Sequence, residues 1–118
     1  MTITSEQLSE LTSGVEKLLK LHWLAGLLEG EGSFMPPSPS APKLVRINIT
    51  MTDKDVIEQV AKLVGVKYIH KRTPTNENWK PSYRITILGT RAVNLMVLLR
   101  PLMGERRKQQ IDKALASI

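Results

Sequence analysis

The sequence contains no cysteine, which excludes a disulfide framework and thiolate metal sites. Histidine is scarce as well, with only His22 and His70, so a zinc site is not expected and any metal must bind through oxygen or imidazole ligands. The longest apolar run, around residues 21–28, is far shorter than the roughly 20 residues that a membrane span needs. No secretory leader is recognisable. We therefore expect a soluble intracellular protein, in the cytoplasm or an organelle matrix, with no membrane partner.

The charge that is present is mainly basic. The 118 residues include 17 Lys and Arg against 11 Asp and Glu, which gives a formal net charge of +6. A basic balance of this size favours an anionic partner, although many basic proteins bind none. A hydrophobic content of 42% supports one packed core, so residues 1–118 are expected to form a single domain.

Hydrophobic periodicity predicts helices alternating with pairs of strands. Thr4 and Gln7 have capping-box spacing and predict a short leading helix. A Pro- and Ser-rich segment at 35–42 can form neither a helix nor a central strand. The remaining predicted helices span 15–29, 52–65, 91–99 and 105–118, and the strands span 43–52, 66–72 and 82–88, with a short strand before the loop. Either Thr52 or Asp53 is the helix cap. This order predicts an α+β fold around an antiparallel sheet.

The stretch LAGLLEGEG at residues 24–32 is unusual, because an apolar helix ends in two acids that lie between glycines. Taken alone, a buried helix that ends at a glycine stop with two solvated acids explains most such patterns. The small residues, however, allow a second backbone to approach closely. Two such helices meeting at a two-fold axis would bring two carboxylates together, which is a natural oxygen-ligand site for Mg²⁺.

The nine residues resemble the signature of the LAGLIDADG homing endonucleases. The first four, Leu24 to Leu27, match outright, Leu28 replaces another aliphatic residue, and Glu29 and Glu31 replace the two acids. The flanking residues Trp23 and Ser33-Phe34 are also similar, and the likeness extends over about 20–114. It implies an αββαββα fold with an antiparallel four-stranded sheet shaped as a saddle over DNA. Residues 1–16 then form an N-terminal extension.

The resemblance also implies roles for individual residues. Glu31 corresponds to the acid that binds the catalytic metal, with the backbone carbonyl of Gly30 as a further ligand, whereas Glu29 corresponds to a structural position. Either Arg106 or Lys108 corresponds to a basic residue near the scissile phosphate. Because the chain has one motif, a homodimer is implied, and its interface would comprise Leu24, Ala25, Gly26 and Leu28.

A polar face on the predicted sheet is the expected DNA contact, although a merely solvated face is the alternative. A strand of about 7 residues spans about 23 Å, or about seven base pairs, so two subunits would read a roughly palindromic site of about 15 to 20 base pairs. Arg, Asn and Thr suit base edges and phosphates. The expected residues are Arg46, Asn48, Thr50, Tyr68, His70, Arg72, Arg84 and Thr86.

The resemblance implies site-specific, Mg²⁺-dependent double-strand cleavage of DNA by a homodimer, which leaves 3′ overhangs, and a gene that lies in a mobile intron or a similar element. One position departs from the family, since a polar residue commonly ends the second strand and Met51 occupies that place here. The alternative is the same scaffold without cleavage, acting as a DNA-binding regulator or as a maturase that binds intron RNA. Trp79 either caps the sheet or lies against DNA.

Overall fold

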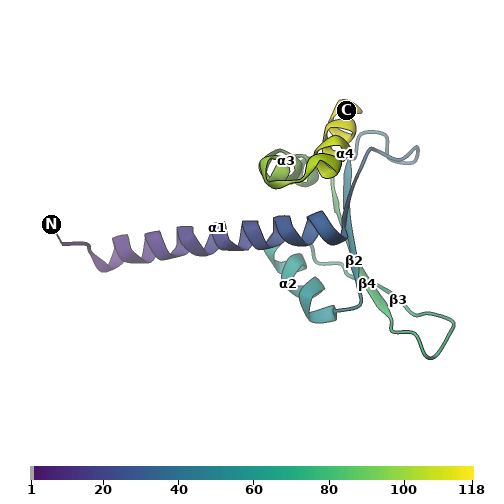
Figure 1. Cartoon of the computed structure of the whole chain (residues 1–118), viewed down its shortest axis with the longest axis horizontal. Coiled ribbons are helices and arrows are strands. Elements are labelled where there is room, and N and C mark those ends of the chain that lie inside the picture. Colours follow the sequence, from purple (N-terminus) through teal and green to yellow (C-terminus); the bar gives the residue numbers. More distant parts are fainter. Residues whose placement is uncertain (1) are drawn as a thin grey trace.

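A computed structural model describes residues 2–118 and shows helices covering one face of a four-stranded sheet (Figure 1). The α+β class and the αββαββα order predicted from the sequence are confirmed, and the final helix predicted over 105–118 is present as α4. The elements are α1 (Ser5–Glu31), β1 (Gly32–Met35), β2 (Arg46–Met51), α2 (Lys54–Val64), β3 (His70–Arg72), β4 (Ser82–Leu88), α3 (Gly89–Leu99), a 3₁₀ turn (Arg100–Leu102) and α4 (Glu105–Ala116).

The sheet has the strand order β1-β2-β4-β3, and each neighbouring pair is antiparallel. Alternation along the two central strands places Ile47 and Ile49 of β2, and Ile85 and Ile87 of β4, in the core beneath the helices. The predicted strand at 82–88 is correct, whereas β2 is shorter than the predicted 43–52. The opposite face of the sheet carries no helix (Figure 1).

Helix α1 is a single helix of 27 residues, so the prediction of two separate helices was wrong. The predicted capping box is present: the Gln7 amide donates to Thr4 Oγ1 at 3.1 Å, and the Thr4 amide donates to Gln7 Oε1 at 3.0 Å. A lone glycine at position 14 lowers helix propensity but does not interrupt the hydrogen bonds. The first 16 residues of α1 are exposed and project away from the body (Figure 1).

The other boundaries follow from local backbone chemistry. Asp53 rather than Thr52 occupies the cap position of α2, but its side chain makes no capping hydrogen bond. Gly65 ends α2 in the left-handed conformation with φ of 75°, which a residue without Cβ adopts at little cost. Strand β3 has only three residues instead of the predicted 66–72. Within residues 2–118, no helix has both the length and the apolar character needed to cross a membrane.

Candidate nucleic-acid interface

The polar residues expected at a DNA contact lie on the helix-free face of the sheet, which we call the polar face. The strand register aligns Thr50 of β2 with Arg84 of β4, and Arg84 with His70 of β3, in one row across three strands. A second row aligns Ser33, Asn48 and Thr86. The structure thus brings together all of the expected residues that lie in strands: Arg46, Asn48, Thr50, His70, Arg72, Arg84 and Thr86. Tyr68 precedes β3 and is exposed, with its ring centroid 6.4 Å from that of His70.

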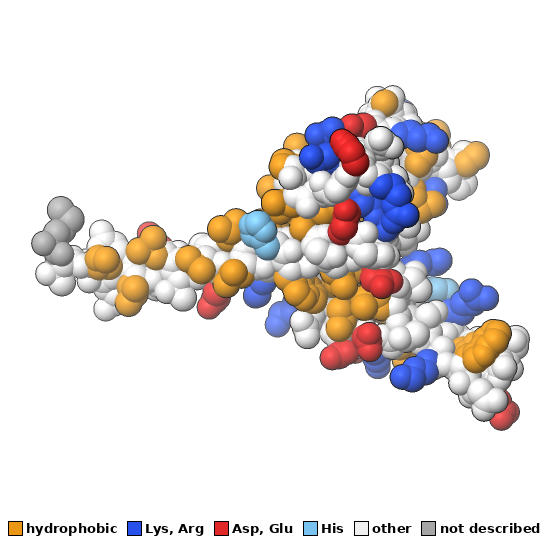
Figure 2. Space-filling view, viewed as in Figure 1, with side chains coloured by type: hydrophobic (Ala, Val, Ile, Leu, Met, Phe, Trp, Pro, Cys, Tyr) orange, Lys and Arg blue, Asp and Glu red, His pale blue; other side chains and the backbone are white. Residues whose placement is uncertain are grey.

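The polar face has a positive charge, because its strand residues include three arginines and no acid. Figure 2 shows basic side chains along this side of the molecule. The loop between β3 and β4 projects beyond the sheet (Figure 1) and carries Trp79, which is 65% exposed. This distribution of charge suits an extended polyanion.

Two side chains of β2 hold buried polar atoms that have no hydrogen-bond partner within residues 2–118. Arg46 donates from Nη2 to the Pro36 carbonyl at 3.3 Å, but its Nε has no partner. Asn48 donates from Nδ2 to Met35 Sδ at 3.3 Å, and its Oδ1 is also unpaired. Buried unpaired donors and acceptors cost free energy. Both residues would therefore gain from a polar ligand that reorients them.

The two acids of the motif have different surroundings. Glu29 accepts a hydrogen bond at Oε1 from the Gly104 amide at 2.9 Å, and its backbone carbonyl accepts one from Arg107 Nε at 3.0 Å. Glu31 is the last residue of α1 and is exposed, and within residues 2–118 no hydrogen bond or ion pair engages its carboxylate. It stands two positions before Ser33 of the polar face. Glu31 is therefore the motif acid that is left available at the point where helix and sheet meet.

Arg107 is an important residue that the sequence analysis missed. It is only 7% exposed, and besides Glu29 it contacts Gln110 Oε1 through Nη1 at 3.0 Å. The two basic residues that were predicted instead lie on either side of it: Arg106 is exposed and Lys108 is half-buried. The sequence did contain a signal, because Arg107 lies at helical spacing from the apolar residues Met103, Ile111 and Ala114. The structure shows that all four side chains are buried.

Candidate metal ligands lie at the end of α1. In the part of the chain that the structure describes, residues 2–118, no three Asp, Glu or His side chains form a group that could hold a metal ion. The free carboxylate of Glu31 and the backbone carbonyl of Gly30 are oxygen donors of the kind that Mg²⁺ prefers. They fit the protein part of such a site, in which waters and substrate phosphates complete the shell.

The residues expected at a dimer interface separate into two groups. Leu24, Ala25 and Leu28 are buried against the core of their own chain, whereas Gly26 is on the surface. Gly30 is also exposed, and a Cβ added to Gly26 or Gly30 would meet nothing within 4 Å. Glycine inside a helix costs about 1 kcal/mol relative to alanine. No contact within the described residues, 2–118, requires either glycine.

Comparison with known proteins places this fold in a class, that of the homing endonucleases. The chain belongs to the family of LAGLIDADG-like domains, whose model matches residues 18–95. Its fold is similar to that of the homing endonuclease I-CvuI in complex with its target in the presence of Ca (TM-score 0.61, 20% identity, 85% of this chain and 70% of that chain). No curated protein has significant sequence similarity to the chain.

Two further solved structures show the same fold. One is I-CvuI in complex with the I-CreI target in the presence of Mg, with the DNA not cleaved (TM-score 0.58, 17% identity, 80% of this chain). The other is the archaeal intron-encoded homing endonuclease I-Vdi141I complexed with DNA (TM-score 0.57, 17% identity, 79% of this chain). The chain spans 63% of the length of each of these two proteins.

Proposed function

We propose that this chain is one subunit of a homodimeric, Mg²⁺-dependent endonuclease that cuts both strands of a specific DNA site. The observation that carries the proposal is the difference between the two motif acids. Glu29 is engaged by Gly104 and Arg107, whereas Glu31 is free at the end of α1, next to the basic polar face. An acid retained at the position that binds metal in this family, without a structural partner, supports a catalytic role.

The dimer would form through the exposed side of α1 that contains Gly26 and Gly30. The two glycines are four residues apart, so they lie on one face of the helix. The absence of a Cβ at both positions allows two helices to approach closely. A two-fold axis along this face would bring the two Glu31 carboxylates together and join the two polar faces into one surface for DNA.

The side chains would then have separate tasks. The polar face would position the duplex, with its arginines on phosphates and base edges. Glu31, together with the Gly30 carbonyl, would hold Mg²⁺, which when bound supplies charge neutralisation at the phosphate and a more acidic water. Arg106 or Lys108 would stabilise charge that develops on the phosphate. Arg107 positions Glu31 indirectly, because it fastens the end of α1 to α4.

A second candidate function has one observation in its favour. Met51, at the end of β2, is paired with Tyr83 and packs against the core, so the strand ends without a polar side chain at that point. Where family members order water with a polar residue, this chain offers an apolar one. The same scaffold would then bind DNA as a regulator, or intron RNA as a maturase, without cutting.

Cleavage of a randomised palindromic DNA library in Mg²⁺ would test the proposal, with sequencing of the ends. We expect enriched double-strand breaks with 3′ overhangs from the natural sequence and none from Glu31→Gln. Glu31→Asp is the matched control, because it keeps the carboxylate and should retain part of the activity. Sequence-selective binding without breaks by all three proteins would overturn the endonuclease and favour the regulator; selective binding of structured RNA alone would favour the maturase.

A further inference from the structure

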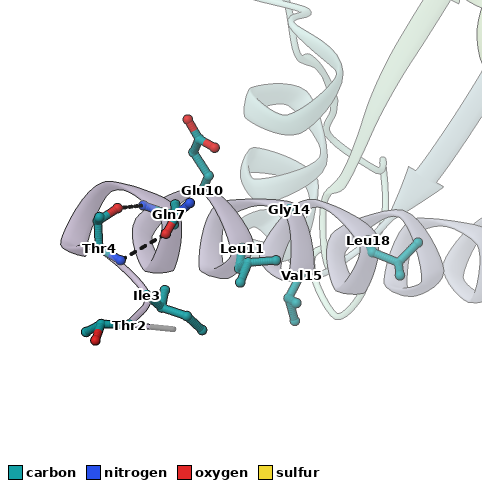
Figure 3. A pocket seen from close by; sticks show the side chains of 9 residues that line it. All are labelled: Thr2, Ile3, Thr4, Gln7, Glu10, Leu11, Gly14, Val15 and Leu18. Atoms are coloured by element: carbon teal, nitrogen blue, oxygen red, sulfur yellow. Dashed lines mark hydrogen bonds between the residues drawn. The ribbon is translucent and has the colours of Figure 1, made fainter.

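The projecting half of α1, residues 5–20, has an apolar side that no other part of residues 2–118 covers. Its large side chains are more than half exposed: Leu8 59%, Leu11 59%, Val15 56%, Leu18 56% and Leu19 63%. Isolated exposed apolar residues are ordinary on protein surfaces, but a contiguous stripe usually marks an interaction site. Figure 3 shows Leu11, Val15 and Leu18 along one side of the helix, with Glu10 on the other.

The stripe continues onto the glycine face of the same helix. Leu8 precedes Gly26 by 18 residues, which is five full turns at 3.6 residues per turn, so both point in one direction. Val15 and Leu19 precede Gly26 by 11 and 7 residues, and each lies within about 20° of that direction. One straight line therefore runs from Leu8 to Gly30 along α1. Helix α1 is unbroken over this length.

The charged residues of the projecting half lie off this line, with Glu16 nearest to it at about 80°. Lys17 precedes Gly26 by nine residues, or two and a half turns, and so points in the opposite direction. Glu6 and Glu10 lie about 160° away by the same count. Thr12 is near the line, but its hydroxyl is satisfied, since Oγ1 donates to the Leu8 carbonyl at 2.9 Å. Between residues 5 and 20 the stripe is therefore apolar except for Thr12, and His22 lies about 40° from the line between Leu19 and Gly26.

We propose that residues 5–20 of α1 pair with the same residues of a second copy as a parallel two-helix coil. This proposal rests on the homodimer of the proposed function, whose two-fold axis along the glycine face would make the two helices parallel. Leu8, Leu19 and Gly30 are spaced by 11 residues, as are Val15 and Gly26. The same residues also recur at seven, as Leu8 and Val15 or Leu19 and Gly26 do, so the spacing suits a nearly straight pair and does not fix the hand of a supercoil.

The pairing would have a defined purpose in the dimer. A coil of this length is marginal by itself, because short helices gain little until they pack. Joined to the glycine contact, it adds apolar burial far from the DNA surface and fixes the relative rotation of the two motif helices. It would strengthen the dimer without occupying any part of the polar face.

Cysteine cross-linking tests the arrangement directly, because the natural sequence has no cysteine. Leu8→Cys and Val15→Cys each place one thiol on the stripe, and Lys17→Cys places one on the opposite side. In a parallel pair in register, residues on the stripe meet their own copies at distances that a disulfide can bridge. We expect cross-linked dimers from the first two variants after oxidation and little from the third. Equal cross-linking of Lys17→Cys would overturn the pairing.

Dimer dissociation, measured by analytical ultracentrifugation on the full chain, separates this inference from the proposed function. Leu8→Glu/Val15→Glu should raise the dissociation constant at least about tenfold, and Gly26→Leu should raise it independently. A dimer that responds to Gly26→Leu only, and gives no cross-link, would overturn the coil and leave the proposed homodimer intact. A dimer that responds to the double variant only would retain the coil and overturn the glycine interface. A monomeric natural chain would overturn both.

Discussion

Arg107 donates a hydrogen bond from Nε to the backbone carbonyl of Glu29 at 3.0 Å, across 78 positions of sequence. A carbonyl near the end of a helix has no partner within that helix, and here an arginine from α4 satisfies it. The same glutamate accepts from the Gly104 amide at the start of α4. Together these bonds hold the end of α1, and therefore the position of Glu31 two residues later, against the last helix.

Replacement of Arg107 should be costly for stability. Arg107→Met keeps most of the buried aliphatic stem but leaves the Glu29 carbonyl and Gln110 without a donor, so we expect a loss of about 1.5–3 kcal/mol in the free energy of unfolding. Urea unfolding followed by circular dichroism measures it. Arg106→Met on the neighbouring exposed position is the control and should change stability by less than about 0.5 kcal/mol. Equal effects at the two positions would mean that the hydrogen bond contributes little.

The sequence predicts the sheet well where alternation is strong. In β2 and β4, isoleucines alternate with Arg, Asn and Thr, and this period of two fixes which side of the strand is buried. Strand β3 was predicted too long, because Val66 and Ile69 pack against the core from an irregular segment. An apolar residue at strand spacing does not reveal whether its backbone pairs with a neighbour.

The candidate site was harder to predict for a related reason. Residues 15–29 are apolar on several sides, and the sequence does not reveal which side faces the chain's own core. The structure shows that Leu24, Ala25 and Leu28 face the core, while Gly26 remains outside. Arg107 was missed because charged runs on a helix are usually solvated. Only the helical spacing with Met103 and Ile111 indicated that its side chain points inward.

Substitution by alanine at two glycines of the motif, Gly32 and Gly26, should change the stability of the fold in opposite directions. A Cβ at Gly32 would lie 2.7 Å from Leu28 Cδ2 and 2.8 Å from the Leu28 carbonyl oxygen, so the backbone must shift. Gly32→Ala should destabilise the fold by about 1–3 kcal/mol. Gly26→Ala meets no atom of its own chain and should stabilise the isolated subunit by up to about 1 kcal/mol.

The experiment compares urea unfolding of both glycine variants at the lowest protein concentration that can be measured, where a dimer contributes least. At high concentration Gly26→Ala should lose this advantage if the glycine face is an interface. Stabilisation by Gly26→Ala that is the same at all concentrations would argue against close helix contact at that position.

Arg84 occupies the centre of the row Thr50, Arg84 and His70, so its removal should weaken DNA binding more than removal of a basic residue elsewhere. If Arg84 contacts one phosphate, Arg84→Ala should reduce the steepness of the plot of the logarithm of the DNA-association constant against the logarithm of the salt concentration by roughly 0.9. If it contacts a base edge, the loss is about 1–3 kcal/mol for the specific site only. Fluorescence anisotropy at several salt concentrations distinguishes these cases. Lys62→Ala on α2, exposed away from the polar face, is the control and should alter neither quantity.

The pKa of Asp112 provides a prediction about α4. Arg100 donates from Nε to Oδ1 at 2.7 Å and from Nη2 to Oδ2 at 2.8 Å, and this bidentate pair lowers the pKa of Asp112 below its ordinary value of 3.8. The more distant charge of Lys108 lowers the pKa further, but by less. In an NMR titration, Arg100→Gln should therefore raise the pKa of Asp112 more than Lys108→Gln does.

The direction of the effect on stability follows from the sign of this shift. Because the pKa of Asp112 is lower in the folded chain than in the unfolded chain, the pair stabilises the fold fully above the ordinary carboxyl pKa and is lost as the pH falls through the lowered value. The unfolding free energies of the natural chain and of Asp112→Asn should therefore differ at neutral pH and converge in acid. The difference should be small, because both side chains are solvated and salt screens the pair. A difference that grows as the pH falls would contradict the assignment, since the carboxylate would then be stabilised in the unfolded chain rather than by Arg100.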